Sequence, residues 1–562
     1  MKKLYFLLTI CVFMFIVGCE GTLELDLLDD PNNPSPETAD LESLYNSVQN
    51  EFEDFISAPQ IFTSQLCRHI ALTDGSDYQS AFGPTTFDNI WTQAYSGFLP
   101  DANAVIERTT ATSQFYHTGS TKIMQGYVLM TMVDLFGDVP LGDVGQGIDA
   151  ISPAPQSGES VYAEALALVR EGITELEMNT AASPNIDLMY SSEDGWIAAG
   201  NSLLLKAAVN MRDNEAFNAI IDSKSYIAET GLDWQWQYGS SRDNPDSRHP
   251  FYVDHYEAAD GRYLSNWLMW AMTEDKEFAD PRTRSYFYRQ VPAIPLYDPN
   301  RFDCIFSTLP DASKTPEHYL NCADEMPYCV GSIDQGYYGR DHGNGNGIPP
   351  DGDIRTRFGV YPAGGKFDAD TFIGTQNLGT DGGLGAGIHP LMPSFYIDFF
   401  RAEMALVNGN EAEAREHLLN GVTGSINKVI EFTSTDQGSL DEFVYLSPIL
   451  GLFGSDFLPS QTAIDTFIGE VANRYDVASN KMDVVGLEFL IASFGNGVEG
   501  YNFIRRTGSP SNIQPAILPT AGEFVRSALY PAVHVNLNQN ATQKSTADRV
   551  FWDNGNLGQC FN

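Results

Sequence analysis

Apolar residues recur every three or four positions in several long stretches of this chain, and that spacing constrains its fold more than any other feature. Within residues 159–179 the series is Tyr162, Ala165, Leu166, Val169, Ile173 and Leu176. This spacing puts the apolar side chains on one face of an α-helix, which has to pack against another element. The same pattern predicts helices over residues 122–136, 196–212, 399–407 and 411–432. Helices in such pairs suggest tetratricopeptide-like hairpins, although no strict repeat of roughly 34 residues is visible.

The middle of the chain has a different character, because it is rich in residues that favour turns. Residues 331–365 contain ten glycines, together with Pro349, Pro350 and Pro362. A long irregular segment inside a compact protein is usually functional or disordered, and the aromatic residues here favour an ordered one. We therefore expect a mostly α-helical protein, in which tetratricopeptide-like hairpins form a scaffold that carries a loop-rich irregular lobe. At 562 residues we also expect more than one packed sub-lobe.

The N-terminus carries a processing signal. Lys2 and Lys3 precede an apolar run over residues 4–17, and the small residue Gly18 is followed by Cys19. The run is shorter than the roughly 20 residues of a membrane span, so it reads as a signal peptide. A cysteine at this place predicts a lipoprotein in which Cys19 is lipidated. The alternative is an ordinary secreted protein whose Cys19 is incidental.

The balance of charge restricts the classes of ligand. The chain has 32 Lys and Arg against 74 Asp and Glu, a formal net charge of −42. Such a charge argues against nucleic acid, whose binding depends on basic side chains that neutralise phosphates. It also disfavours polyanionic polymers, so neutral ligands are expected. After the N-terminal run, no apolar stretch reaches the length of a transmembrane helix.

Five cysteines remain beyond Cys11 and Cys19, and they are Cys67, Cys304, Cys322, Cys329 and Cys560. An odd number leaves at least one of them unpaired. Cys322 and Cys329 are close enough in sequence for a small disulfide loop, which we favour over free thiols. A zinc site with His318 matches no common ligand spacing.

Several short runs, in their order along the chain, carry a family resemblance. They include Leu135–Pro140, Trp196 with Asn201–Leu203, Gly339–Asn344, Ile348–Gly352, Gly359–Gly365, Phe494–Asn502, Arg505–Gly508, Leu529–Pro531 and Phe551–Asp553. Together with the lipoprotein signal, these runs resemble the SusD/RagB family of Bacteroidetes outer-membrane lipoproteins, in its SusD-like branch. The resemblance covers almost the whole chain after Cys19.

The resemblance implies a fold and a role. Family members are mostly helical, with tetratricopeptide-like hairpins on one side and a loop-rich lobe that faces the ligand. They act as lids on TonB-dependent transporters of the SusC type, capture oligomeric nutrients and catalyse nothing. The implied location is the outer membrane, with a lipid anchor and the protein facing outward. Acidic residues after Cys19, such as Glu20 and Glu24, resemble a surface-export signal, but a solvated linker would look the same.

The predicted organisation follows from these patterns. It comprises a signal peptide (1–18), an acidic, proline-containing tether (19–40), a helical region (41–230), a loop-rich, ligand-facing lobe (231–390), a second helical region (391–512) and a C-terminal irregular segment (513–562).

Ligand contacts vary within the family, so the site has to be argued from chemistry. A neutral glycan is bound by aromatic rings against its C–H faces and by polar side chains at its hydroxyls. Three clusters combine such residues in predicted loops. They are Asp74–Tyr78 continuing to Phe82, with Asp77 and Tyr78 as the candidates; Trp234 and Trp236 before the polar stretch Ser240–Arg248; and Tyr337 and Tyr338 with Arg340, Asp341 and His342. Trp234 and Trp236 alternate as on a strand, which would put both rings on one face. The alternative for each cluster is burial beneath a loop.

No cofactor is required by this function, but oxygen-bearing side chains separated by glycines can hold calcium. The candidates are Asp341, Asn344, Asn346, Asp351 and Asp353. The bidentate Glu of an EF-hand is missing, and glycine-rich turns explain the same residues without a metal.

Other functions stay open at this stage. The sequence has no H-E-x-x-H, G-x-S-x-G or Walker A motif, whereas a two-carboxylate glycosidase has no motif that could exclude it. A pure protein scaffold is a further alternative. Within the family reading, an oligopeptide-capturing lid of the RagB type competes with a glycan-capturing one, and the Trp234–Trp236 pair favours the glycan.

Overall fold

The computed structural model describes residues 39–141, 152–178, 183–258, 261–293, 315–329, 335–345, 352–435, 437–440 and 457–561. The predicted signal peptide, the lipidation site Cys19 and the calcium candidates Asn346 and Asp351 lie outside these residues.

Helices dominate the described residues, as the sequence predicts. The first set is α2 (Leu41–Ser57), α3 (Gln60–Leu66), α4 (Tyr78–Ala81), α5 (Asp88–Thr92), α6 (Leu99–Thr112), α7 (Phe115–Phe136), α8 (Gly158–Glu177), α9 (Glu193–Met211) and α10 (Asn214–Ser223). The helices among the described residues of the middle of the chain are short: α11 (Pro250–Tyr256), α12 (Asn266–Thr273), α13 (Thr283–Tyr286) and α14 (Glu317–Leu320). The last set is α15 (Ser394–Val407), α16 (Glu411–Thr433), α18 (Gln461–Val477), α19 (Lys481–Ala492), α20 (Gly497–Thr507) and α21 (Ala532–Leu537).

Two small antiparallel pairs complete the regular structure of these residues. Strand β1 (Trp234–Gln237) pairs with β4 (Ile388–Met392), and Trp236 lies opposite His389. Strand β2 (Phe287–Tyr288) pairs with β3 (Arg357–Phe358). Both pairs join segments that are far apart in the sequence.

The five predicted helical stretches are all helical, and the predicted fold class is confirmed. In α8 the six periodic residues of the series from Tyr162 to Leu176 are buried. Helix α7 is buried almost throughout, polar residues included, which places it at the centre of the first helical region. It ends at Gly137, whose φ of 75° suits glycine better than any other residue.

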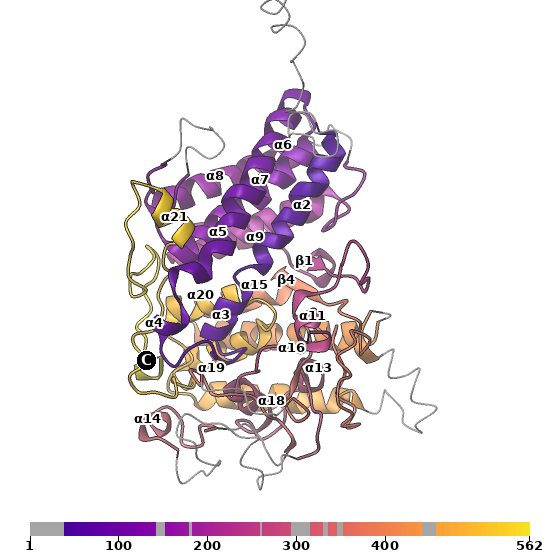
Figure 1. Ribbon diagram of the computed structural model, residues 1–562, viewed down its shortest axis with the longest axis vertical. Coiled ribbons are helices and arrows are strands. Elements are labelled where there is room, and N and C mark those ends of the chain that lie inside the picture. The colour runs from indigo at the N-terminus through magenta and orange to yellow at the C-terminus, as the bar shows by residue number, and fades with distance from the viewer. Residues whose placement is uncertain are drawn as a thin grey trace, which may run out of the picture.

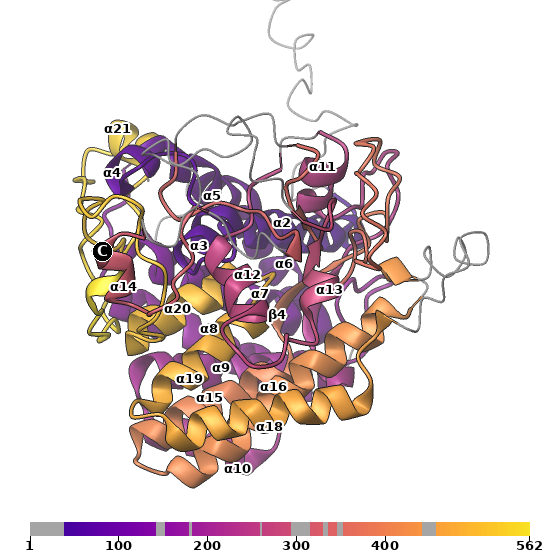
Figure 2. The same cartoon turned by 90° about the horizontal axis from the view of Figure 1, so that it is seen from below.

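Neighbouring helices pack as antiparallel hairpins. Helices α7 and α8 approach closely at Gly119 and Gly172, where a Cβ on either glycine would lie 2.6 Å from the carbonyl oxygen of the other. Figure 1 shows α2, α6, α7 and α8 at one end of the molecule and α16, α18 and α19 toward the other. Seen from below, α15, α16 and α18 lie side by side, and α15 also contacts α9 of the first set (Figure 2).

A buried charge network links the two helical regions. The Nζ atom of Lys206 on α9 lies 2.5 Å from Glu499 on α20 and 3.5 Å from Asp134 on α7, and all three side chains are fully buried. One hydrophobic cluster runs from Leu44 to Phe561 and draws on both helical regions and on the middle of the chain. The predicted region boundaries stay predictions.

The cysteines pair differently from the prediction. Cys322 forms a disulfide with Cys560, and Cys329 is disulfide-bonded as well, so the predicted loop between Cys322 and Cys329 is wrong. Sequence proximity failed as a guide because the C-terminal residues fold back beside α14 and bring Cys560 within 5.8 Å of Cys322, Cα to Cα. Cys67 is free and buried, as an odd number of cysteines requires.

No helix in the described ranges combines the length and the apolar character needed to cross a lipid bilayer.

Candidate functional site

A cavity of about 310 Å³ opens between α3, α4 and α5, at the place where a residue from the middle of the chain reaches back to them. It is lined by Ala58, Ile61, Phe62, Gln65, Asp74, Ala81, Phe82, Thr86, Ile90 and Arg262. These elements lie next to one another in Figure 1. The cavity has an apolar wall and a polar end, which we describe in turn.

The apolar wall comes from helix faces. Ile61 and Phe62 belong to α3, and Phe82 follows α4 directly. The rings of Phe62 and Phe82 meet edge to face, with centroids 5.0 Å apart, and are 4% and 2% exposed. They therefore offer the cavity small apolar areas and no broad aromatic face.

The polar end is a chain of three side chains. Arg262 Nη1 donates to both carboxylate oxygens of Asp74, at 2.7 and 2.6 Å. Gln65 Nε2 donates to Asp74 Oδ2 at 2.8 Å, and Gln65 is only 1% exposed. The side chains of Asp74 and Arg262 are 42% and 31% exposed, so this end of the cavity reaches solvent.

The predicted clusters at Tyr78 and at Asp341 contact each other beside the loop that carries Asp74. The loop that carries Asp74 packs against the glycine-rich loop that follows Asp341, where a Cβ on Gly345 would lie 2.9 Å from the backbone of Gly75. The hydroxyl of Tyr78 lies 3.2 Å from His342 Nε2. Close contact between these loops fixes the position of Asp74.

Tyr78 and Asp77 have structural roles. Tyr78 is 2% exposed, and its hydroxyl donates to the Phe561 carbonyl at 3.4 Å. Asp77 caps α4, because its Oδ1 accepts from Ser80 N at 2.7 Å. Asp74 and Phe82, from the same segment, line the cavity, whereas Asp77 and Tyr78 do not.

The prediction of an exposed tryptophan platform is wrong. Trp234 and Trp236 do alternate on a strand and share a face, but they are 0% and 9% exposed. The helices cover that face of β1, since Trp234 stacks on Phe52 of α2 at 5.9 Å and meets Tyr127 of α7 at 5.3 Å. A strand pattern reports which side chains share a face and not whether that face meets solvent.

The cluster around Tyr337 is also buried, contrary to the prediction. Tyr337 and Tyr338 are 4% and 1% exposed, and the Arg340 guanidinium lies over the Tyr263 ring at 4.7 Å. These side chains hold the irregular lobe together, and none of them lines the cavity.

Asp341 is an internal anchor. Its carboxylate accepts from Cys329 N at 2.7 Å, from Asn266 Nδ2 at 2.8 Å and from Gln514 Nε2 at 3.1 Å. Burial raises the pKa of Asp341 to about 6, and the hydrogen bonds from Asn266 and Cys329 oppose that shift. Burial also lowers the pKa of the neighbouring His342, so that imidazole is neutral.

The calcium site stays a prediction. Asn344 is buried and Asp353 is exposed, whereas Asn346 and Asp351 lie outside the described residues. In the part of the chain that the structure describes, no group of three or more His, Cys, Asp or Glu side chains is placed to hold a metal.

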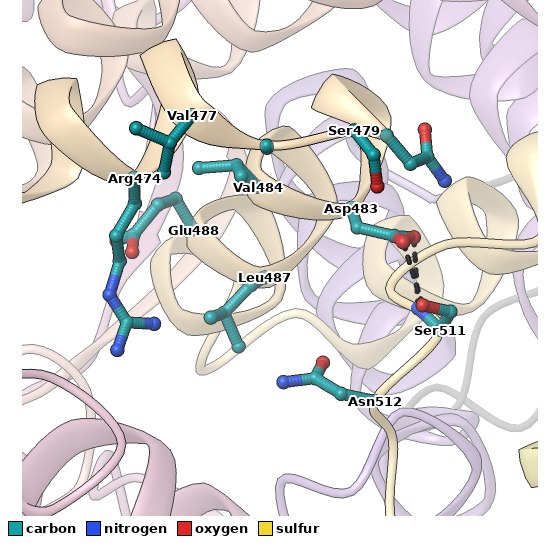
Figure 3. Close-up of a pocket in the computed structure, with 11 residues that line it drawn as sticks. Arg474, Val477, Ser479, Asp483, Val484, Leu487, Glu488, Ser511 and Asn512 are labelled. Carbon is teal, nitrogen blue, oxygen red and sulfur yellow. Dashed lines mark hydrogen bonds between the residues drawn. The ribbon is translucent and has the colours of Figure 1, made fainter. Parts of the chain in front are cut away.

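A second cavity, also of about 310 Å³, lies at the turn between α18 and α19 (Figure 3). Its polar side chains are largely engaged within the protein. Asp483 accepts from Ser511 N at 2.9 Å and from Ser509 Oγ at 2.8 Å, and Arg474 Nη1 donates to Asp275 at 2.7 Å. Val484 and Leu487 supply an apolar side.

Gln65, Thr86, Ile90 and Arg262 were missed in the sequence. The first three lie outside the predicted helices and clusters, and no local pattern connects Arg262 with Asp74, which lies 188 positions earlier. Only the folded chain brings them together.

The chain is similar to known proteins in sequence and in fold. Residues 31–293, which include every residue lining the cavity at Asp74, match the family model SusD-like_2, described as "Starch-binding associating with outer membrane". The sequence matches none of the curated proteins.

Solved structures share the fold over nearly the whole chain. A SusD/RagB family protein from Bacteroides thetaiotaomicron is 14% identical, with a TM-score of 0.62, over 92% of this chain and all of that one. A structure described as a chitin-binding protein is 14% identical, with a TM-score of 0.63 and the same coverage. A chitin-binding SusD homolog from Flavobacterium johnsoniae is 15% identical, with a TM-score of 0.57, over 91% of this chain and 98% of that one.

The sequence match covers the part of the chain that forms the candidate site, and the structural match extends the same architecture to the remainder. Residues 31–293 are thus similar to the SusD-like_2 family model, and over 92% of its length the chain shares the fold of a solved SusD/RagB family structure.

Proposed function

We propose that this protein is a cell-surface lipoprotein that binds a neutral oligosaccharide or polysaccharide and delivers it to a SusC-type TonB-dependent transporter. The observation that carries the proposal is the cavity at Asp74, where an apolar wall meets side chains with open hydrogen-bonding capacity. Sugars present apolar C–H groups beside hydroxyls, so this combination suits them. The formal net charge of −42 favours neutral over anionic glycans.

The comparisons support a glycan over a peptide as cargo. Two structures with the same fold are described as chitin-binding. A peptide would be held mainly through its backbone, for which an open strand edge is the usual partner. The cavity is formed by helices α3, α4 and α5 and presents side chains.

Binding without catalysis is part of the proposal. Hydrolysis of a glycosidic bond generally needs two carboxyl groups that flank it. Of the described residues that line the cavity, Asp74 is the one carboxylate, and Arg262 already neutralises it.

Attachment to the membrane is proposed through lipid on Cys19. Several acyl chains would hold the protein almost permanently, since each buried CH₂ contributes about 0.8 kcal/mol. The acidic and proline-containing residues 19–40 would then act as a tether between the lipid and α2.

The test is a binding screen with the chain from residue 20 onward, which contains every described residue. Affinity electrophoresis against neutral glucans, mannans, fructans, xylans and soluble chitin derivatives should show retardation by at least one polymer. Calorimetry with a peptide digest runs in parallel. Retardation by no glycan, with heat from the peptides, would replace the proposal by an oligopeptide-capturing lid. Release of reducing sugar would show a glycosidase.

A further inference from the structure

The polar end of the cavity at Asp74 has donors and an acceptor that the protein leaves unused. Arg262 donates to Asp74 through Nη1, whereas its Nε and Nη2 have no acceptor among the described residues. Gln65 donates to Asp74 through Nε2, and its Oε1 accepts no hydrogen bond from the described residues. Gln65 is 1% exposed and lines the cavity, so its side-chain oxygen is held in the cavity wall as an acceptor for a ligand.

The apolar wall has the wrong shape for stacking a whole sugar ring. Phe62 and Phe82 are nearly covered, and they meet each other at 88°. Ile61 and Ile90 add branched aliphatic surface. Such a wall accommodates a small apolar group, such as a methyl, better than the flat face of a pyranose.

The size of the cavity is consistent with one substituted sugar residue. Its volume of about 310 Å³ lies at the lower end of the range for small-molecule sites, which runs from roughly 300 to 1,000 Å³. One residue of a glycan chain can enter while its neighbours stay outside. The cavity therefore selects a glycan by the substituent on one sugar residue and not by the length of the glycan.

We propose that this cavity receives the acetamido group of an N-acetylated hexosamine within the captured glycan. The methyl group packs against Ile61, Phe82 and Ile90. The carbonyl oxygen accepts from Arg262, and the amide N–H donates to Gln65 Oε1 or Asp74. This inference rests on the proposed function and names the class of sugar that the same site selects.

Other substituents fit the arrangement less well. A hydroxyl group leaves the apolar wall in contact with water. A carboxylate or sulfate meets Asp74 and the strong negative charge of the whole protein. The acetamido group is neutral, carries both a donor and an acceptor, and adds the methyl that the wall requires.

The first test compares chitopentaose with cellopentaose, which share the β-1,4 linkage and differ in the acetamido group. Calorimetry with the chain from residue 20 onward should give an affinity for chitopentaose at least about tenfold higher. In saturation-transfer NMR with the same oligomer, the acetamido methyl should receive more saturation than the ring protons. Equal affinities together with ring-dominated saturation would overturn the inference and leave glycan binding intact. No binding to any glycan would overturn the proposed function as well.

A matched pair of variants localises the effect. Ala58→Leu fills the cavity from the C-terminal end of α2, where the helical backbone tolerates leucine. Ala478→Leu makes the same change in the cavity between α18 and α19. We expect Ala58→Leu to reduce the preference for chitopentaose at least about fivefold and Ala478→Leu to leave it unchanged. Retention of the full preference in folded Ala58→Leu, judged by its thermal unfolding, would place the acetamido group elsewhere.

Discussion

The guanidinium of Arg262 holds the carboxylate of Asp74 across 188 residues of sequence, with Nη1 within 2.7 Å of both oxygens. The pair forms the solvent-facing polar end of a cavity whose other walls come largely from α3, α4 and α5. Arg262 lies in the middle of the chain, just before α12, so the contact fixes the loop-rich lobe to the first helical region at the candidate site.

Replacing Arg262 by Gln should weaken glycan binding about tenfold, which corresponds to about 1.4 kcal/mol, because the cavity loses its charged donors. Stability should change little, since exposed ion pairs contribute about 1 kcal/mol or less. Calorimetry and thermal unfolding measure the two effects. The control is Arg415→Gln, which removes an ion pair with Asp476 at 2.7 Å between α16 and α18. An equal loss of affinity in the control would refute a specific role for Arg262.

Trp234 should matter for folding and not for ligand contact. Its ring is fully buried among Phe52, Tyr127 and Trp196, so Trp234→Ala should lower the free energy of unfolding by about 3–5 kcal/mol. Trp234→Phe should cost less and keep the glycan affinity of the wild type. Denaturant titration and calorimetry test this. If Trp234→Phe lost binding at unchanged stability, the Trp234 ring would contact the ligand after all.

Glu53 should make stability depend on pH. Burial raises the pKa of Glu53 to about 7 from 4.5, although Tyr238 Oη donates to it at 2.6 Å. The folded protein thus holds a proton that the unfolded chain has released, and the stability of this protonated form is lost as the pH rises from about 4.5 through about 7. Glu53→Gln should therefore raise the melting temperature at pH 8 and leave it nearly unchanged at pH 4.

The matched control for this change is Glu523→Gln at an exposed position. It should give the same melting temperature as the wild type at both pH values. If Glu53→Gln shifted the melting temperature equally at pH 4 and pH 8, ionisation of Glu53 would not be the cause.

Lys206 should be essential for stability because it neutralises Glu499 and Asp134 in the core. Lys206→Met leaves two buried carboxylates without their cation and should cost about 3–5 kcal/mol of unfolding free energy. The double variant Lys206→Met with Glu499→Gln should recover part of that loss, since it removes one of the two charges. Denaturant unfolding of both variants decides; a double variant less stable than the single one would contradict this account.

The disulfide between Cys322 and Cys560 should stabilise the C-terminal end. It joins residues 238 positions apart, and Phe561 beside it is buried and accepts from Tyr78. Replacing both cysteines by Ser should lower the free energy of unfolding by about 2–5 kcal/mol. Cys67→Ser, at the free and buried cysteine, serves as the comparison for thiol loss alone. Stability equal to the wild type after the double replacement would show that packing suffices.

The helical scaffold was predictable because its pattern is local. Residues 159–179 and 411–432 repeat their apolar side chains with the period of the helix that they form, as α8 and α16. The alternation of Trp234 and Trp236 likewise predicted a strand with both rings on one face. Local spacing determines which side chains share a face, and that much the sequence determined by itself.

Exposure and pairing were decided by the tertiary structure. Whether the face of Trp234 meets water depends on α2 and α7, and whether Cys322 bonds to Cys329 or Cys560 depends on where the C-terminus packs. The candidate cavity has the same origin, because Gln65, Asp74 and Arg262 converge only through contacts between distant segments. Such contacts depend on the packing of the whole chain, and no local spacing of residues encodes that packing. The helices and the class of fold, in contrast, follow from the spacing of apolar residues along the sequence.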